Sequence, residues 1–354
     1  MHNVSLSETY HPLANERFLR ALLPETSMHP TATLPRRVFA AALLASFALP
    51  LAAPAQAQNW PTRPVRIIVP FPPGGASDPL ARIVAQKLGE QLGRNFVVEN
   101  KAGAGTTIGT AEVAKSTPDG YTLLLAPAPF AITQFVYAKL PYDGRKDLVP
   151  IGLVQTTPTV VVANPALGAR TPQEFMELAR KQPGKITYGT PGEGTLPHLI
   201  GEMLNLQAGI KLLHVPYKGG GPAQNDLLAG HIDSSILTPM VRDLIKAGKL
   251  VVIGTTSLTP TPSTADWPTF AQSGLPGFEA LAWFGLMAPA GTPPEIVAKL
   301  SQNLQLALKN PETRAQIAQS GDVPEGTQAE FSALLQREYQ RWERTVKAAG
   351  IKQE

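Results

Sequence analysis

Two Gly-rich turns constrain the fold of this chain more than any other feature of its sequence. The first, PFPPGGASD at residues 70–78, follows the apolar run VRIIV, and the second, TPGEGTLPH at residues 190–198, follows KITYG. Each turn is predicted to lead from a strand into a helix, where unpaired backbone N–H groups and the helix dipole favour an anion. Two such turns can hold one small carboxylate between them.

Strand-like and helix-like runs alternate along the rest of the chain, which predicts a layered α/β fold with largely parallel sheets. The predicted strands are 65–71, 95–100, 120–126, 185–189, 212–217, 233–237 and 284–288. Apolar residues at helical spacing before Gly93, Thr171 at a capping box, and Thr292 and Thr327 near helix starts mark four of the helices. Two further extended runs, 159–163 and 250–256, are interpreted as paired crossings between two lobes.

The N-terminal part has the order of an export signal. Arg36 and Arg37 precede an uncharged apolar stretch, 38–53, and residues 55–57 read Ala-Gln-Ala, the small-x-small pattern before a signal peptidase site. The apolar stretch is too short for a transmembrane anchor, which needs about 20 residues. We therefore expect residues 1–57 to be an extension and a cleaved signal peptide, with a mature periplasmic protein that begins at Gln58.

Two details of this part stay open. The basic pair also resembles a twin-arginine signal, but Pro35 stands where Ser or Thr is usual, so ordinary secretion is favoured over twin-arginine export. Residues 1–27 resemble neither a charged leader nor a packed element. Met28 is therefore an alternative start to Met1.

Composition argues against a nucleic-acid partner and against cysteine chemistry. The chain has 31 Lys and Arg against 27 Asp and Glu, a net charge of +4, and no basic run longer than a dipeptide. Such a small excess does not support binding to phosphate backbones. The absence of cysteine excludes disulfides and Cys-based zinc sites. The hydrophobic content of 43% is sufficient for two cores.

Catalytic alternatives find little support in the residues. The chain has no G-x-S-x-G, H-E-x-x-H or P-loop motif, and only His198, His214 and His231 lie beyond the export signal. The segment Gly103–Gly109 resembles a dinucleotide fingerprint whose third glycine comes one residue late, so a tight strand-to-helix turn explains it better. A secreted α/β hydrolase remains the rival from another class, and it would need a base beside an activated nucleophile.

A series of motifs resembles one family closely. They are, in order, RPVRIIVPFPPGGASD, VVENKAGAG, PDGYTLLLA, LPYD, PGKITYGTPGEGT, HVPYKGGGPA, GHID, PGFEALAWFGLMAPAGTP and KAAGIK. The chain is similar over essentially its whole mature length to the solute-binding proteins of tripartite tricarboxylate transporters, the TctC or Bug family.

The resemblance implies a two-lobed periplasmic binding protein of type II-like, Venus flytrap architecture, each lobe a mixed sheet flanked by helices. Residues 58–160 with 254–354 would form one lobe and 161–253 the other. Such a protein is no enzyme and needs no cofactor or metal. It would bind a di- or tricarboxylic, amino-acid-like or aromatic acid as a monomer. Its partner would be the TctA and TctB type membrane subunits of a transporter, or a periplasmic sensor that uses the same site.

The resemblance also implies which residues contact the ligand. They lie on the two turns, after the strand 120–126, and beside a strand of the second lobe: Phe71, Gly74, Gly75, Ser77, Asp78, Ala128, Thr190, Gly192, Gly194, Thr195, His198 and Asp233. The glycines allow the backbone to approach a carboxylate closely. The hydroxyl and imidazole groups can donate hydrogen bonds.

Several of these roles have alternatives. Asp78 can cap a helix instead of meeting the ligand, and His198 can fix its loop through a backbone carbonyl. The segment Pro127–Phe130 is proline-rich and aromatic, and it can form an apolar wall that suits an aromatic acid. Glu193 would repel an anion, so it is expected to face solvent or a cationic group of an amino-acid-like ligand.

Overall fold

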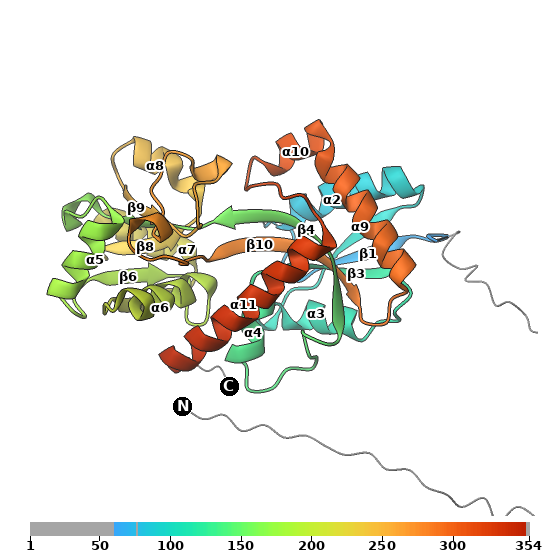
Figure 1. The fold of residues 1–354 in the computed structure, drawn as a ribbon, viewed down its shortest axis with the longest axis horizontal. Helices are drawn as coiled ribbons and strands as arrows, with labels where there is room; N and C mark the ends of the chain where they lie inside the picture. Colours follow the sequence, from blue (N-terminus) through green and yellow to red (C-terminus); the bar gives the residue numbers. More distant parts are fainter. Residues whose placement is uncertain (1–59, 76, 352–354) are drawn as a thin grey trace, which may run out of the picture. The chain divides into compact units, whose positions relative to one another are not determined.

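The computed structural model describes residues 60–75 and 77–351, so the predicted export signal and its cleavage site lie outside the described residues. Two five-stranded mixed sheets organise this part of the chain (Figure 1). The first has the order β2-β1-β3-β10-β4, formed by Phe96–Asn100, Val65–Val69, Thr122–Pro127, Leu281–Pro289 and Leu148–Pro158. The second has the order β7-β6-β8-β5-β9, formed by Leu213–Pro216, Thr187–Thr190, Ser234–Leu237, Val160–Ala163 and Val251–Thr255.

Helices flank both sheets, which confirms the predicted fold class. Those belonging to the first sheet are α2 (Ser77–Leu92), α3 (Thr107–Ala114), α4 (Pro129–Val136), α9 (Pro294–Lys309), α10 (Pro311–Ile317) and α11 (Gln328–Ala349). Those belonging to the second are α5 (Pro172–Lys181), α6 (Leu196–Ala208), α7 (Gly220–Ala229) and α8 (Arg242–Lys246). The last helix, α11, packs against β4 and also against α6 of the second sheet.

The inner strands of the first sheet are largely buried on both faces, as their mostly apolar sequences indicate. Side chains alternate along β1: Val65, Ile67 and Val69 pack with α2 and α9, whereas Ile68 packs in the cluster that contains α3, α4 and α11. Residues Val65 and Ile67–Val69 are fully buried. The sheet is therefore the rigid base from which the first Gly-rich turn leaves.

Local signals located most helix ends correctly. Helix α2 ends before Gly93, whose φ of 68° is the left-handed conformation expected of a C-terminal cap. The Thr327 hydroxyl accepts the Glu330 N–H at 3.0 Å at the start of α11. Thr292 is an exception, because its hydroxyl donates to the Pro289 carbonyl and α9 begins later, at Pro294.

The crossing between the sheets differs from the prediction. The runs interpreted as crossings form β5 and β9, which pair antiparallel inside the second sheet. The chain passes between the sheets at Thr159, one residue beyond β4, and again between Thr256 and Ala280. Thr159 and Thr256 exchange backbone and side-chain hydrogen bonds, and the Ala280 N–H donates to the Thr256 carbonyl at 2.9 Å. These buried contacts tie the two passages together.

The segment that resembles a dinucleotide fingerprint is a strained turn. Ala104 and Thr106 have φ angles of 42° and 87°, in the region that favours glycine. Thr106 is buried, with an exposed fraction of 4%, and its hydroxyl has no hydrogen-bond partner in the described part of the chain. Both features cost free energy of folding.

We expect Thr106→Gly to raise the free energy of unfolding by about 1 kcal/mol. The substitution removes the backbone strain and the unsatisfied hydroxyl, and these gains exceed the added chain entropy of glycine. Thr107→Gly is the matched control, because Thr107 has φ of −68° and its hydroxyl donates to Ala104 at 2.9 Å. Urea unfolding should show the two variants shifted in opposite directions, and a destabilised Thr106→Gly would contradict this account.

Candidate ligand-binding site

The two Gly-rich turns lie at the sheet edges that the crossing joins. In the first sheet, β10 runs antiparallel to β3 and β4, so β1 and β3 end at the edge where β4 ends. In the second sheet, β6 runs parallel to β8, whose last residue Leu237 lies opposite Val160 at the start of β5. Both turns therefore leave their sheets toward the crossing.

Contacts within the first turn orient its carboxylate toward its own helix. Asp78 accepts hydrogen bonds from Arg82 at 3.2 Å, and the Asp78 N–H donates to the Gly75 carbonyl at 3.1 Å. The guanidinium of Arg82 lowers the pKa of Asp78 below its usual value. The Asn100 amide donates to the Phe71 carbonyl at 3.1 Å and links the turn to β2. Ser77 is buried at the start of α2, whereas Gly74 and Gly75 are exposed.

Contacts within the second turn use its hydroxyl groups. The Thr195 hydroxyl donates to the Gly192 carbonyl at 2.7 Å, and the Thr190 hydroxyl lies 2.6 Å from Nε2 of His214. Gly192 and Gly194 have φ angles of 146° and 69°, so the turn depends on glycine at both positions. The predicted hydroxyl donors thus fix the shape of the turn in this conformation.

His198 also holds this turn. Its Nδ1 accepts the Gly194 N–H at 3.0 Å, and its ring, 7% exposed, stacks on His214 with centroids 3.9 Å apart. The contact favours the turn-fixing alternative for His198, through a backbone N–H and not a carbonyl. Because Nδ1 accepts, the proton of the neutral ring lies on Nε2, which is 4.0 Å from Glu202.

Sequence reasoning missed His214 as a member of the site. It lies on β7 and becomes a neighbour of the turn only because β7 pairs in parallel with β6, Tyr188 opposite His214. Its place inside a predicted strand, 212–217, was the one signal that the sequence carried. Only the pairing of that strand with β6 places His214 beside the second turn.

The segment after β3 is packed more deeply than predicted. The Ala128 N–H donates to the Trp283 carbonyl at 3.0 Å, and Ala128 is 2% exposed. Phe130 is fully buried and stacks on Tyr142 with the ring planes 5° apart. The interpretation of this segment as an aromatic wall for the ligand is therefore wrong for Phe130, because α4 begins at Pro129 and directs that ring into the core.

Asp233 is not brought together with the two turns. Its carboxylate accepts from the Thr187 N–H and hydroxyl, both at 2.8 Å. Thr187 begins β6 and Asp233 precedes β8, whereas the second turn leaves β6 at its other end, after Thr190. Asp233 thus ties two strand starts at the opposite edge of the sheet.

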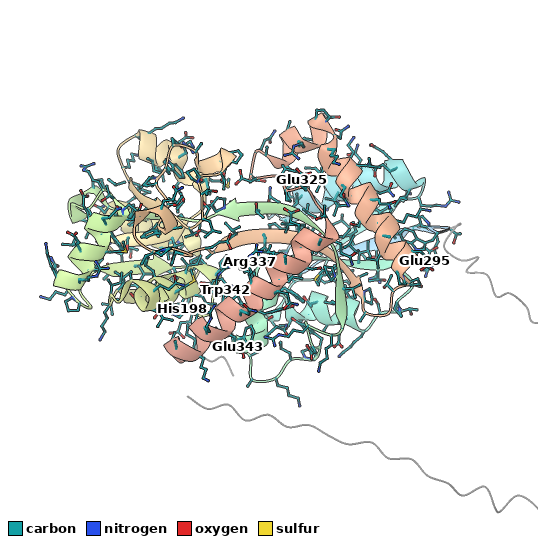
Figure 2. The ribbon with its side chains drawn as sticks, viewed as in Figure 1. His198, Glu295, Glu325, Arg337, Trp342 and Glu343 are labelled. Atoms are coloured by element: carbon teal, nitrogen blue, oxygen red, sulfur yellow. The ribbon has the colours of Figure 1, made fainter. Side chains whose placement is uncertain are left out.

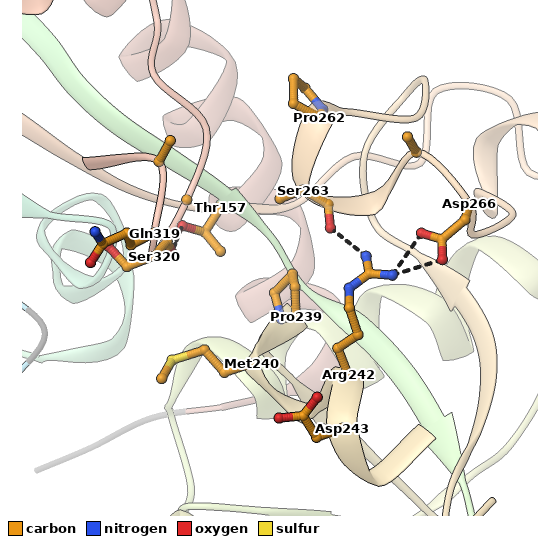
Figure 3. A pocket seen from close by; sticks show the side chains of 13 residues that line it. Thr157, Pro239, Met240, Arg242, Asp243, Pro262, Ser263, Asp266, Gln319 and Ser320 are labelled. Atoms are coloured by element: carbon orange, nitrogen blue, oxygen red, sulfur yellow. Dashed lines mark hydrogen bonds and ion pairs between the residues drawn. The ribbon is translucent and has the colours of Figure 1, made fainter. Parts of the chain in front are cut away.

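A groove of about 550 Å³ lies beside the crossing (Figure 3). It is lined by Thr157, the segment 239–243 without Val241, residues 262–266 without Thr264, and residues 318–321. Arg242 crosses one wall and binds Asp266 at 2.7 Å and the Ser263 carbonyl at 2.8 Å. Neither Gly-rich turn contributes to this lining.

Residues 60–75 and 77–351 contain neither a metal-binding cluster nor a membrane-spanning helix. This part of the chain holds no group of three or more His, Asp or Glu side chains arranged to bind a metal ion. It also holds no helix with the length and apolar character needed to cross a membrane.

The family model described as "Tripartite tricarboxylate transporter family receptor" matches residues 80–351. The chain belongs to this family. It is 37% identical over 306 residues to BugT of Bordetella pertussis, covering 85% of this chain and 94% of BugT. Among solved structures, R. palustris Rpa4515 with adipate is 31% identical, with a TM-score of 0.69 and coverage of 83% of this chain and all of the other. MatC of Rhodopseudomonas palustris with bound malate is 30% identical, with a TM-score of 0.66 and coverage of 81% and 100%.

Family membership confirms three expectations from the sequence. This chain is a solute-binding receptor of the TctC and Bug family, and it has the two-lobed fold of periplasmic binding proteins. Members of the family bind their solutes without transforming them, so the hydrolase alternative is excluded.

Proposed function

We propose that this receptor captures a short linear dicarboxylate, of the kind of malate or adipate, between its two Gly-rich turns. The observation that carries the proposal is the placement of both turns at the sheet edges that the crossing joins. The related proteins solved with adipate and with malate support the class of ligand.

Uncharged groups would stabilise the negative charge of the ligand in this site. Neither turn contains Lys or Arg, so backbone N–H groups other than that of Gly194, which donates to His198, and the positive ends of the α2 and α6 dipoles would attract the anion. The burial of Phe130 removes the residue that favoured an aromatic acid. An aliphatic ligand with a carboxylate at each end fits two anion-favouring turns that lie on different sheets.

Capture would proceed by closure about the crossing. The hydrogen bonds among Thr159, Thr256 and Ala280 join the two passages at one point, which suits a hinge. The two moving lobes would carry the two sheets. Their predicted bounds, 58–160 with 254–354 and 161–253, shift slightly at the hinge, because Val160 and residues 254–255 belong to β5 and β9 of the second sheet. In the closed form both turns contact the same ligand.

Delivery would take place in the periplasm after export and cleavage behind Ala57. The receptor would present the closed form to TctA and TctB type membrane subunits of a tripartite tricarboxylate transporter. A receptor for a periplasmic sensor would use the same fold and site. Transport of labelled ligand by membranes that contain the three components would distinguish the two partners.

Thermal-shift measurements on the mature protein test the proposal. Malate, adipate, citrate, glutamate and benzoate form the panel, with adipamide as an uncharged control for adipate. A ligand at about 100 times its Kd adds roughly 2.7 kcal/mol of stability. We expect malate or adipate to give the largest shift. A panel in which no acid raises the midpoint, or in which adipamide equals adipate, would refute the proposal.

We expect Gly194→Val to weaken dicarboxylate binding at least about tenfold. A β-branched residue at φ of 69° strains the backbone by about 1–3 kcal/mol, so the turn no longer keeps the shape that binds the ligand. Gly209→Val is the matched control. Gly209 has φ of 60° and open space around it, and it caps the other end of α6. Both variants should lose stability, but only Gly194→Val should lose affinity by calorimetry. Equal affinities would remove the second turn from the site.

A further inference from the structure

We propose that His198 and His214 act as one positioning unit, a neutral stacked pair that holds the second Gly-rich turn in the shape that binds the ligand. This inference rests on the proposed function, since it assumes that the turn contacts the carboxylate. It adds His214 to the site and assigns both rings a role that depends on their protonation.

The two rings hold opposite ends of the same turn. His214, on β7, contacts the Thr190 hydroxyl at 2.6 Å where β6 ends. His198, on α6, accepts the Gly194 N–H at 3.0 Å just before the helix begins. The rings stack at 11° with centroids 3.9 Å apart, so a shift of one ring moves the other. The turn is thereby clamped between a strand and a helix.

The clamp requires uncharged rings. An imidazolium carries a proton on both nitrogens, so Nδ1 of a protonated His198 can no longer accept the Gly194 N–H. Two positive rings at stacking distance also repel each other. Burial lowers the pKa of both histidines, and the neighbouring His198 lowers that of His214 further.

Two carboxylates near the pair oppose the effect of burial on the pKa of His198. Glu202 of α6 lies 4.0 Å from Nε2 of His198, and it accepts a hydrogen bond from the Tyr188 hydroxyl of β6 at 2.6 Å. Glu202 and Glu193 of the turn both raise the pKa of His198 and so partly offset its burial. His198 is thus the ring on which protonation and turn shape are most closely linked.

The direction in which affinity for the carboxylate changes with pH distinguishes a positioning role of the histidines from a simple electrostatic one. A positive charge beside an anion site would strengthen carboxylate binding as the pH falls. A clamp that needs a neutral acceptor predicts weaker binding as the pH falls. Protonation of the ligand changes the Kd of every variant by the same factor. The ratio of Kd values between two variants is therefore independent of it.

The experiment uses the mature protein and adipate or malate, with three variants. His198→Leu removes the acceptor, His198→Asn keeps an acceptor near the Nδ1 position without a titrating ring, and His231→Asn removes an exposed histidine away from the turn. At pH 8 we expect His198→Leu to weaken binding about tenfold, as loss of one buried hydrogen bond implies, and His198→Asn to restore most of it. From pH 8 to pH 5 the Kd of the wild type and of His231→Asn should rise more than that of His198→Asn.

Three affinity results would each overturn the inference: unchanged affinity of His198→Leu, identical pH profiles for wild type and His198→Asn, or tighter wild-type binding in acid relative to His198→Asn. The Gly194 amide resonance of the ligand-free protein provides a second readout. It should move with pH in the wild type and not in His198→Asn, and a static resonance would overturn the inference. Failure of the wild type to bind any panel acid refutes the proposed function instead, while the amide resonance still decides whether the pair positions the turn.

Discussion

Glu338→Ala is expected to lower the free energy of unfolding by about 3 kcal/mol. Glu338 is fully buried on α11, where it accepts the indole N–H of Trp342 at 2.7 Å and that of Trp283 at 3.2 Å. It also pairs with Arg341. Truncation to alanine leaves two buried indole donors without their acceptor. The expected loss of unfolding free energy is at the lower end of the range for a broken buried ion pair, because Arg341 keeps its contact with Glu279 at 2.8 Å.

This cluster joins the C-terminal helix to the passage between the sheets. Trp283 lies on β10, and Glu279 precedes the Ala280 contact at the crossing. Figure 2 shows Trp342 along α11, the helix that packs on β4 and α6. Burial raises the pKa of Glu338, and the Arg341 guanidinium opposes that rise. Because Glu338 accepts the indole N–H groups of Trp283 on β10 and Trp342 on α11, loss of its carboxylate should loosen α11 from both sheets.

Urea unfolding followed by far-UV circular dichroism measures the effect. Glu338→Gln is the conservative variant, which keeps an acceptor oxygen for the indoles and should lose less stability than Glu338→Ala. Glu343→Ala is the matched control on the same helix, since its side chain is 59% exposed and its loss should cost under about 0.5 kcal/mol. An alanine variant at Glu338 as stable as the one at Glu343 would show that the network contributes nothing.

Acidification is expected to remove on the order of 2 kcal/mol of stability through His214, since solvent around the half-buried ring reduces the effect of its lowered pKa. Burial and the adjacent His198 lower the pKa of His214 from 6.5 to about 4. The unfolded chain therefore binds a proton at higher pH than the folded protein does. The stabilisation is complete above pH 6.5, declines as the pH falls below 6.5, and is lost near pH 4.

The difference between wild type and His214→Phe isolates this contribution from the carboxylates that titrate in the same range. Phenylalanine keeps a ring against His198 but cannot take a proton, so the unfolding free energy of this variant should fall less steeply between pH 7 and pH 4. Parallel curves for wild type and His214→Phe would show that His214 is not held neutral by the fold.

Local physical rules let the sequence determine much of this fold. The apolar run at 65–69 predicted a strand, Gly93 predicted a helix end, and the hydroxyl of Thr327 predicted a helix start. Each of these signals acts within a few residues of itself, where backbone sterics and capping are decisive. The same local character identified both Gly-rich turns. The strand β4 was not predicted. Helix α10 was not predicted either, although Asn310 caps its start and Pro311 is its first residue.

The sequence by itself determined the family, the α/β class and the two turns, because those depend on residue order and local conformation. Only the tertiary structure decided which residues meet: strand pairing brought His214 to the second turn and placed Asp233 at the far edge, and helix α4 turned Phe130 into the core. The sequence placed the crossing within the runs 159–163 and 250–256, but it did not predict the hydrogen bonds that join Thr159 to Thr256, which lie far apart in the chain. Such contacts follow from register and packing, which no local pattern encodes.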